Sequence, residues 1–216
     1  MKRGAIFDQD GLMFDTEPIF ARAWAEAGER LGIIIPKGFH AAVAGSGGEA
    51  AKRIIRGLLP EADPDAIMSL TYQISYEIQA HTLPEKPGLH EILNFFREYG
   101  VKMAVASSSH RAAVERNLEN SGVRPYFEAV VTGEDLSRGK PDPEAFLTAA
   151  ARLGLPPEDC YVFEDSFNGV RAGHAAGCRT IMIPDLFQPD ETLADCYDAC
   201  YPDLLTALEQ IKKGYI

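Results

Sequence analysis

The chain has 216 residues, 46% of them hydrophobic and 25% charged, a composition typical of a globular protein with a sizeable core. Its 32 acidic residues outnumber its 21 basic ones, and the formal net charge of -11 disfavours nucleic acid or an anionic membrane as a partner. No run approaches the roughly 20 apolar residues of a membrane span, and the four cysteines form no Cys-x-x-Cys pair. We therefore expect a reduced, cytoplasmic protein that is a monomer.

The chain opens on a short apolar run, residues 4–7, which ends at Asp8, Asp10 and Gly11. A run of this kind predicts a buried strand that delivers carboxylates to a loop. Two aspartates so close together raise each other's pKa, so the pair indicates a metal site or a division of labour between two acids. At this point the alternative is a solvated turn that happens to contain two aspartates.

Residues 15–82 show helical periodicity only. A capping side chain and an early proline at residues 15–18 predict the start of a first helix, which Gly32 closes. A glycine-rich loop at residues 45–48 leads into a second helix, and a third opens at Asp63. We therefore predict that residues 15–82 form a small all-helical domain.

The pattern changes after a proline-rich boundary at residues 83–88. Strand-like runs then alternate with helical ones, with strands expected at 101–106, 129–131, 161–163 and 180–183 and helices at 89–99, 113–121, 143–153 and 169–176. This alternation favours a mainly parallel sheet with helices on both faces. The predicted α/β fold is a doubly wound, Rossmann-like core of residues 1–14 and 83–216, interrupted by a helical cap domain of residues 15–82.

Polar residues follow successive predicted strands, and ligands of doubly wound sheets bind at those strand ends. After Asp8 and Asp10, the strand ends lead to Ser107, Ser108 and Ser109, to Lys140, and to Glu164 and Asp165. Carboxylates suit Mg²⁺, hydroxyls and a lysine suit a phosphate, and a carboxylate beside both can attack phosphorus. Taken singly, the serines and Asp165 could cap helices, and Lys140 could be an exposed loop residue. Their occurrence at the ends of successive strands argues against independent accidents.

These stretches also occur in the order of a known family. Residues 7–17, 105–108, 139–143 and 163–169 resemble the four motifs of the haloacid dehalogenase (HAD) superfamily. The resemblance is to its β-phosphoglucomutase-like branch, whose phosphatases and mutases carry a helical cap of the C1 type, and it spans nearly the whole chain. It implies the Rossmann-like core and inserted cap predicted above, with hinges at residues 14–16 and 82–86.

The resemblance implies a role for each matching residue. Asp8 would be the nucleophile that accepts the phosphoryl group, and Asp10 would be the general acid and base. Ser107, the backbone around Ser108, and Lys140 would hold the transferring phosphoryl group. The cofactor would be Mg²⁺, held by Asp8, the backbone carbonyl of Asp10, and Asp165. Glu164 would be either a further ligand or a residue that contacts the ligands without binding the metal.

The substrate class follows from Asp10 and from the cap. Asp10 disfavours dehalogenases and phosphonate-cleaving relatives, which lack an acid at this position. In β-phosphoglucomutases an arginine of the cap binds a second phosphate. In this chain Gly48 or its neighbours occupy the corresponding position. We therefore expect a phosphatase acting on a small phosphorylated metabolite, a sugar or polyol phosphate monoester. A phosphosugar mutase is the alternative, and a catalytically silent binding protein a less favoured one. Cap residues that either face the leaving group or pack the cap are Trp24, Tyr72, Tyr76 and His81.

Overall fold

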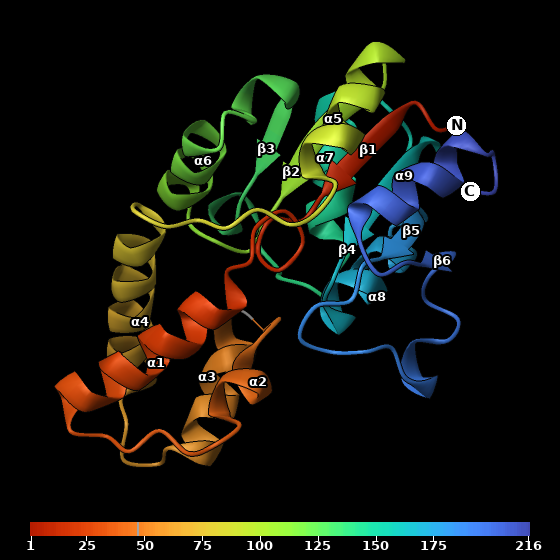
Figure 1. The fold of residues 1–216 in the computed structure, drawn as a ribbon. Coiled ribbons are helices and arrows are strands. Elements are labelled where there is room, and N and C mark those ends of the chain that lie inside the picture. The colour runs from red at the N-terminus through yellow and green to blue at the C-terminus, as the bar shows by residue number, and fades with distance from the viewer. Residues whose placement is uncertain (47) are drawn as a thin grey trace.

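A computed structural model describes residues 1–46 and 48–216, and within them six parallel strands form one sheet (Figure 1). The strands are β1 (Gly4–Phe7), β2 (Lys102–Ala106), β3 (Ala129–Val131), β4 (Cys160–Glu164), β5 (Arg179–Met182) and β6 (Ala199–Cys200). Their order is β3-β2-β1-β4-β5-β6, so the chain winds outward from β1 in both directions. This order confirms the doubly wound, Rossmann-like core, and its direction reverses between β1 and β4, where such sheets bind ligands.

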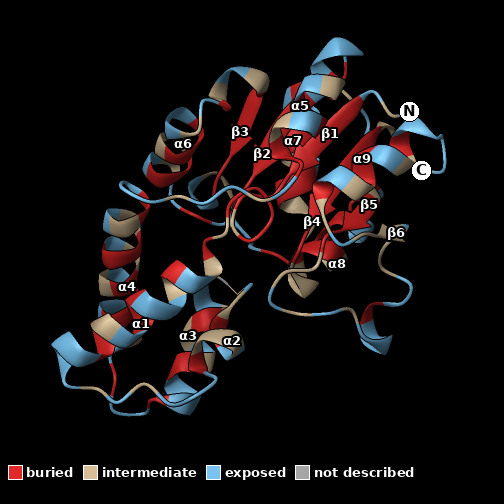
Figure 2. Ribbon diagram, in the orientation of Figure 1, coloured by how far each residue is buried: buried red, intermediate tan, exposed pale blue. Residues whose placement is uncertain are grey.

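Helices cover both faces of the sheet because the strands are apolar on both sides, as their nearly continuous burial in Figure 2 shows. On one face Phe7 and Phe163 stack, with ring centroids 4.8 Å apart. Ile6 and Val162 belong to the core of the other face. The first face packs against α5 (Leu89–Glu98), α6 (Arg111–Asn120) and α9 (Leu204–Lys212), and the second against α7 (Glu144–Leu153) and α8 (Phe167–Ala175).

The register of the central strands brings the functional groups together. Phe7 in β1 lies opposite Val105 in β2 and Phe163 in β4. The residues that come next along the three strands therefore lie at one level, at the carboxyl edge of the sheet. They are Asp8, Ala106 and Glu164.

The segment between β1 and α5 is helical, as predicted, and lies beyond the carboxyl ends of the strands (Figure 1). It contains α1 (Glu17–Leu31), α2 (Phe39–Val43), α3 (Gly48–Leu58) and α4 (Pro64–Gln79). These helices share an apolar cluster of their own, in which Trp24 meets Phe39 edge to face at 5.1 Å. We refer to residues 15–82 as the cap, and its boundaries stay a prediction.

The predicted hinges form a short antiparallel ribbon. The Asp15 N–H donates to the Pro84 carbonyl at 2.8 Å, and the Lys86 N–H donates to the Met13 carbonyl at 2.9 Å. A bridge between Phe14 and Glu85 lies between these bonds. The two chain segments that join the cap to the core therefore run side by side.

Some local predictions were wrong or incomplete. Thr16 precedes α1, but its hydroxyl makes no capping hydrogen bond. The prediction omitted α2, the two-residue β6, and α9, although Asp203 caps α9 by accepting from the Thr206 N–H at 2.6 Å. Single 3₁₀ turns occupy Arg124–Tyr126, Gly133–Asp135, Pro157–Asp159 and Glu191–Leu193. Across the described ranges, the helices are too short or too polar to span a membrane.

Candidate active site

The loop after β1 holds Asp8 and Asp10 at the centre of the sheet edge. The Asp8 N–H donates to the Phe163 carbonyl at 3.1 Å, which continues the pairing of β1 with β4. Gly11 has a φ of 84°, and a Cβ at this position would lie 2.4 Å from Asp165 Oδ2. The turn therefore requires glycine both for its left-handed backbone and for the close approach of the two acidic loops.

Lys140 lies buried among the strand ends, rather than exposed on its loop. Its Nζ donates to Asp8 Oδ1 at 2.5 Å and to Glu164 Oε1 at 2.6 Å. A third bond of 3.2 Å reaches the carbonyl of Ala106. The amine thus contacts the last residues of β2 and β4 and the residue that follows β1, which the strand register places at one level.

Burial and charge shift the pKa values of these groups. Burial raises the pKa of Asp8 to about 8, even though Lys140 opposes the rise, while Glu164 and Asp10 add to it. Burial lowers the pKa of Lys140, but the charges of Asp8 and Glu164 outweigh this effect and keep the amine protonated. The buried carboxylates outnumber the amine, and this surplus of negative charge favours the binding of a cation.

A divalent cation fits the acidic cluster. Asp8, Glu164 and Asp165 are buried, and each places a carboxylate oxygen within 4.8 Å of the others. Burial raises the pKa of Asp165 well above its usual range, and the nearby charges of Glu164 and Asp8 raise it further. These carboxylates are hard oxygen ligands, and they are costly to ionise without a counter-ion. Both properties are typical of a Mg²⁺ site.

Both oxygens of Glu164 already accept hydrogen bonds. Oε1 accepts from Lys140, and Oε2 accepts from the Ser166 N–H at 2.8 Å and from its hydroxyl at 3.0 Å. Gly169 leaves room for the carboxylate, because a Cβ there would lie 1.7 Å from Glu164 Oε1. Glu164 therefore connects Lys140 to the start of α8, and a direct bond to the metal stays a prediction.

Asp10 is hydrogen-bonded to the serines after β2. Its Oδ2 accepts from the Ser109 hydroxyl at 2.8 Å and, more weakly, from the Ser107 hydroxyl at 3.4 Å. Ser107 Oγ in turn accepts from the Ser109 N–H at 3.0 Å. Burial raises the pKa of Asp10, with the Ser109 hydrogen bond opposing it. The expected metal ligand of Asp10, its backbone carbonyl, stays a prediction.

A cleft of about 760 Å³, including the part open to solvent, lies over these groups and reaches the cap. Asp8, Asp10, Ser108, Lys140, Glu164 and Asp165 all line it on the core side. The cap contributes aromatic and polar side chains, among them Glu17, Phe20, Trp24, His40, Ser46 and Tyr72. Trp24 thus both packs the cap and faces the cleft.

A histidine and a glutamate of the cap wall lie close together. His40 Nε2 lies 2.9 Å from Glu17 Oε2. Among the described residues that line the cleft, the basic side chains are Lys140 on the floor and His40 on the wall. The wall therefore presents hydrogen-bonding groups without a lysine or arginine.

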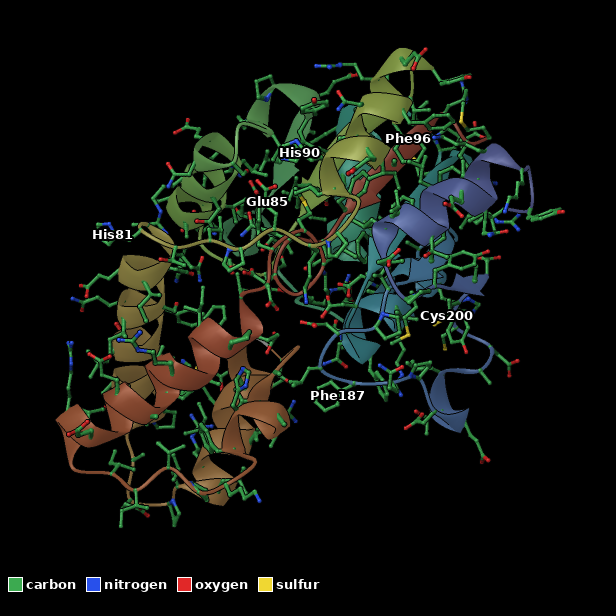
Figure 3. All side chains as sticks on the ribbon, viewed as in Figure 1. His81, Glu85, His90, Phe96, Phe187 and Cys200 are labelled. Carbon is green, nitrogen blue, oxygen red and sulfur yellow. The ribbon has the colours of Figure 1, made fainter. Side chains whose placement is uncertain are left out.

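The glycine-rich loop reaches the core, as predicted. Gly45 lines the cleft, and its carbonyl accepts from Asn168 Nδ2 in α8 at 2.9 Å. Gly48 begins α3, and Gly47 lies outside the described residues. His81, labelled beyond the end of α4 in Figure 3, lines a different surface hollow with Gln79 and Glu85, so it does not face the leaving group.

Comparison with known proteins identifies the family. A model described as haloacid dehalogenase-like hydrolase matches residues 2–177. The chain belongs to this family. The haloacid dehalogenase resemblance of the sequence motifs is thereby confirmed.

Relatives within the family are phosphatases by name. The chain is 33% identical over 178 residues to a phosphorylated carbohydrates phosphatase of Thermotoga maritima, covering 82% of each chain. It is also 33% identical over 184 residues to the fructose-1-phosphate phosphatase YqaB of Escherichia coli, covering 83% of this chain and 95% of that one. The crystal structure of β-phosphoglucomutase from Clostridium difficile shares the fold, with a TM-score of 0.82 and 20% identity over 100% of this chain and 97% of that one.

Sequence reasoning named Ser109 among the strand-end serines without a role of its own, and it assigned no role to Glu17 or His40, which also line the cleft. Ser109 holds Asp10, and its place two residues after Ser107 could have suggested a polar partner. Glu17 lies just after the hinge, within the first motif. Acidic residues are generally favoured in the first turn of a helix, so its charge gave no separate indication of a place in the cleft. His40 lies in α2, which the pattern did not predict, so its pairing with Glu17 has no signal along the sequence.

Proposed function

We propose that this haloacid dehalogenase-like hydrolase removes phosphate from a small sugar or polyol phosphate monoester, with Mg²⁺ as cofactor. The observation that carries the proposal is the buried contact of Asp8 with Lys140 at the floor of a cleft whose wall carries polar and aromatic side chains. Relatives named as phosphatases of phosphorylated carbohydrates and of fructose 1-phosphate support the substrate class. The proposed enzyme works as a monomer.

The reaction proceeds in two steps on Asp8. In the first, a carboxylate oxygen of Asp8 attacks phosphorus, the bond to the leaving oxygen breaks, and Asp10 gives that oxygen its proton. In the second, Asp10 takes a proton from water, whose oxygen attacks the aspartyl phosphate and releases inorganic phosphate and Asp8. Burial raises the pKa of Asp10, which favours the protonated form that a general acid needs.

The remaining groups neutralise and position the phosphoryl group. Lys140 Nζ, the Ser107 hydroxyl and the backbone around Ser108 donate to its oxygens, and the charge of Lys140 reduces its repulsion from Asp8. Asp8, Asp165 and the Asp10 carbonyl would hold Mg²⁺, which when bound would neutralise those oxygens further. Glu164 orients Lys140 from behind the site or adds a ligand.

The cap wall selects the leaving group. Glu17 accepts hydrogen bonds from hydroxyls, His40 supports it, and the faces of Trp24 and Tyr72 cover the carbon chain. A second phosphate would meet the carboxylate of Glu17 without an arginine or lysine from the described wall residues. This arrangement favours a monophosphate of a hydroxylated carbon chain over the bisphosphate that a mutase requires.

A screen for phosphate release tests the proposal. Purified enzyme with Mg²⁺ is given sorbitol 6-phosphate, fructose 1-phosphate and phosphoglycolate, with the Asp8→Asn variant as the control. We expect release from the first two substrates and none from the variant. Conversion of β-glucose 1-phosphate to glucose 6-phosphate, primed by a bisphosphate, would support the mutase instead. A silent binding protein would turn over none of these compounds.

A further inference from the structure

Lys86 joins three separate parts of the chain close to the active site. Its Nζ donates to Asp15 Oδ1 at 2.9 Å and to Asp185 Oδ1 at 2.6 Å. Asp15 belongs to the first linker, Lys86 to the second, and Asp185 to the loop after β5. The lysine side chain is 20% exposed and that of Asp185 is 18% exposed, so both are largely shielded from water.

Lys86 occupies one oxygen of Asp185 and leaves the other without a partner. Asp185 Oδ2 is buried and accepts no hydrogen bond from the described residues. A buried carboxylate oxygen in this state is costly unless a donor is supplied. Since Lys86 fixes Oδ1, the orientation of Oδ2 is fixed as well.

Asp185 Oδ2 faces the acidic cluster. A Cβ built on Gly11 would lie 3.3 Å from Asp185 Oδ2 and 2.4 Å from Asp165 Oδ2. Both oxygens therefore lie within 3.3 Å of one point, in space that only a glycine leaves free. Asp165 is one of the three acids that can hold a metal ion.

Mg²⁺ in proteins keeps several of its waters, and those waters donate hydrogen bonds to carboxylates around the direct ligands. We propose that Asp185, oriented by Lys86, is an outer acid of the metal site that accepts a hydrogen bond from a metal-bound water beside Asp165. The inference rests on the metal site of the proposed function. It adds a residue that lies outside the four family motifs.

A competing explanation is that Asp185 serves only to pair with Lys86 at the hinge. Asp15 provides a matched control, because it binds the same Nζ but belongs to the linker. If pairing with Lys86 were the whole role, Asp15→Asn and Asp185→Asn would have equal effects. If Asp185 supports the metal, only Asp185→Asn would weaken metal binding.

Titration of Mn²⁺ followed by electron paramagnetic resonance, with Mg²⁺ as competitor, measures this affinity without turnover. We expect Asp185→Asn to weaken binding about tenfold, as other losses of outer partners do, and Asp15→Asn to change it less than twofold. The tenfold loss should persist in 0.5 M KCl, which screens long-range charge but not a hydrogen bond. Thermal melts verify that each variant is folded, and Asp185→Ala replaces Asp185→Asn if the latter is not.

The inference would be overturned if Asp185→Asn left the Mn²⁺ affinity unchanged, or if Asp185→Asn and Asp15→Asn lowered it equally. An Asp165→Asn control separates this failure from that of the proposed metal site. If wild-type protein binds no Mn²⁺, or Asp165→Asn binds as tightly as wild type, the metal site itself is wrong. If Asp165→Asn abolishes binding while Asp185→Asn leaves it intact, only the role of Asp185 is lost.

Discussion

Lys140 donates a 2.5 Å hydrogen bond to Asp8, although 132 positions separate the two residues in the chain. Neither group has access to much water, since their side chains are 5% and 9% exposed. The contact therefore places the proposed nucleophile and its counter-charge in one geometry before substrate arrives. Preorganised charge of this kind is the largest contribution to phosphoryl transfer in general.

Replacement of Lys140 should damage both activity and stability. Lys140→Met leaves the carboxylates of Asp8 and Glu164 without their amine, so we expect phosphate release to fall at least about a thousandfold. The free energy of unfolding should fall by about 3–5 kcal/mol, the usual cost of a buried charge without its partner. Assays with sorbitol 6-phosphate and urea titration measure the two effects.

The exposed pair of Arg3 and Asp159 provides the control for this variant. Arg3→Met should cost less than about 1 kcal/mol, as exposed ion pairs do. Activity of Lys140→Met within tenfold of wild type would contradict the role given to the lysine.

Ser109 should act through Asp10. Ser109→Ala removes the 2.8 Å bond that holds the Asp10 carboxylate, and we expect kcat to fall about tenfold while KM changes little. Ser109→Thr, which keeps a hydroxyl, should recover most of the rate. Ser121→Ala, remote from the cleft, is the control. A rise in KM at unchanged kcat would show instead that Ser109 binds substrate.

Glu17 should determine the preference for hydroxylated leaving groups. Glu17→Gln weakens a charge-assisted hydrogen bond in the cap wall, so KM for sorbitol 6-phosphate should rise about tenfold. Phenyl phosphate has no hydroxyl on its leaving group, and its kinetic constants should stay within twofold. Equal losses for both substrates would mean that Glu17 serves the reaction itself.

Gly169 should tolerate no side chain. In Gly169→Ala the new methyl would lie 1.7 Å from Glu164 Oε1, so the glutamate or the start of α8 must shift. We expect a loss of more than about 2 kcal/mol in the free energy of unfolding, measured in urea. Gly57→Ala is the control, because its Cβ meets nothing within 4 Å, and it should stabilise α3 by up to about 1 kcal/mol.

The metal-free protein should lose stability as the pH rises from 4 to 8. Burial raises the pKa of Asp8 to about 8 and that of Asp165 well above 3.8, so the folded state binds more protons than the unfolded state in this range. The free energy of unfolding then falls with rising pH. Thermal melts in EDTA should show it, and Mg²⁺ should raise Tm more at pH 8 than at pH 5. A Tm in EDTA that does not fall between these values would contradict the shifts.

The parallel, doubly wound sheet and the groups at the central strand ends were accessible from the sequence because these strands are short and apolar and lead into polar residues. Asp8 and Asp165 come directly after β1 and β4, whereas Lys140 lies in the loop that begins after β3, and the structure brings the three together. Glu17 and His40 reach the cleft only through the way the cap meets the core, which no local pattern encodes. Thr16 occupies the N-cap of α1 without the capping hydrogen bond expected within residues 15–18, because composition does not specify a rotamer.

The pairing of the two linkers, residues 14–16 and 82–86, affects how the cap domain can vary within the family. Since Asp15 and Pro84 are joined by a backbone hydrogen bond, the cap leaves and re-enters the core at almost the same place. A two-residue turn in place of the cap would close the chain without moving β1 or α5. Different cap domains can therefore be inserted into one catalytic core at this junction. The range of substrates can then change while the reaction stays the same.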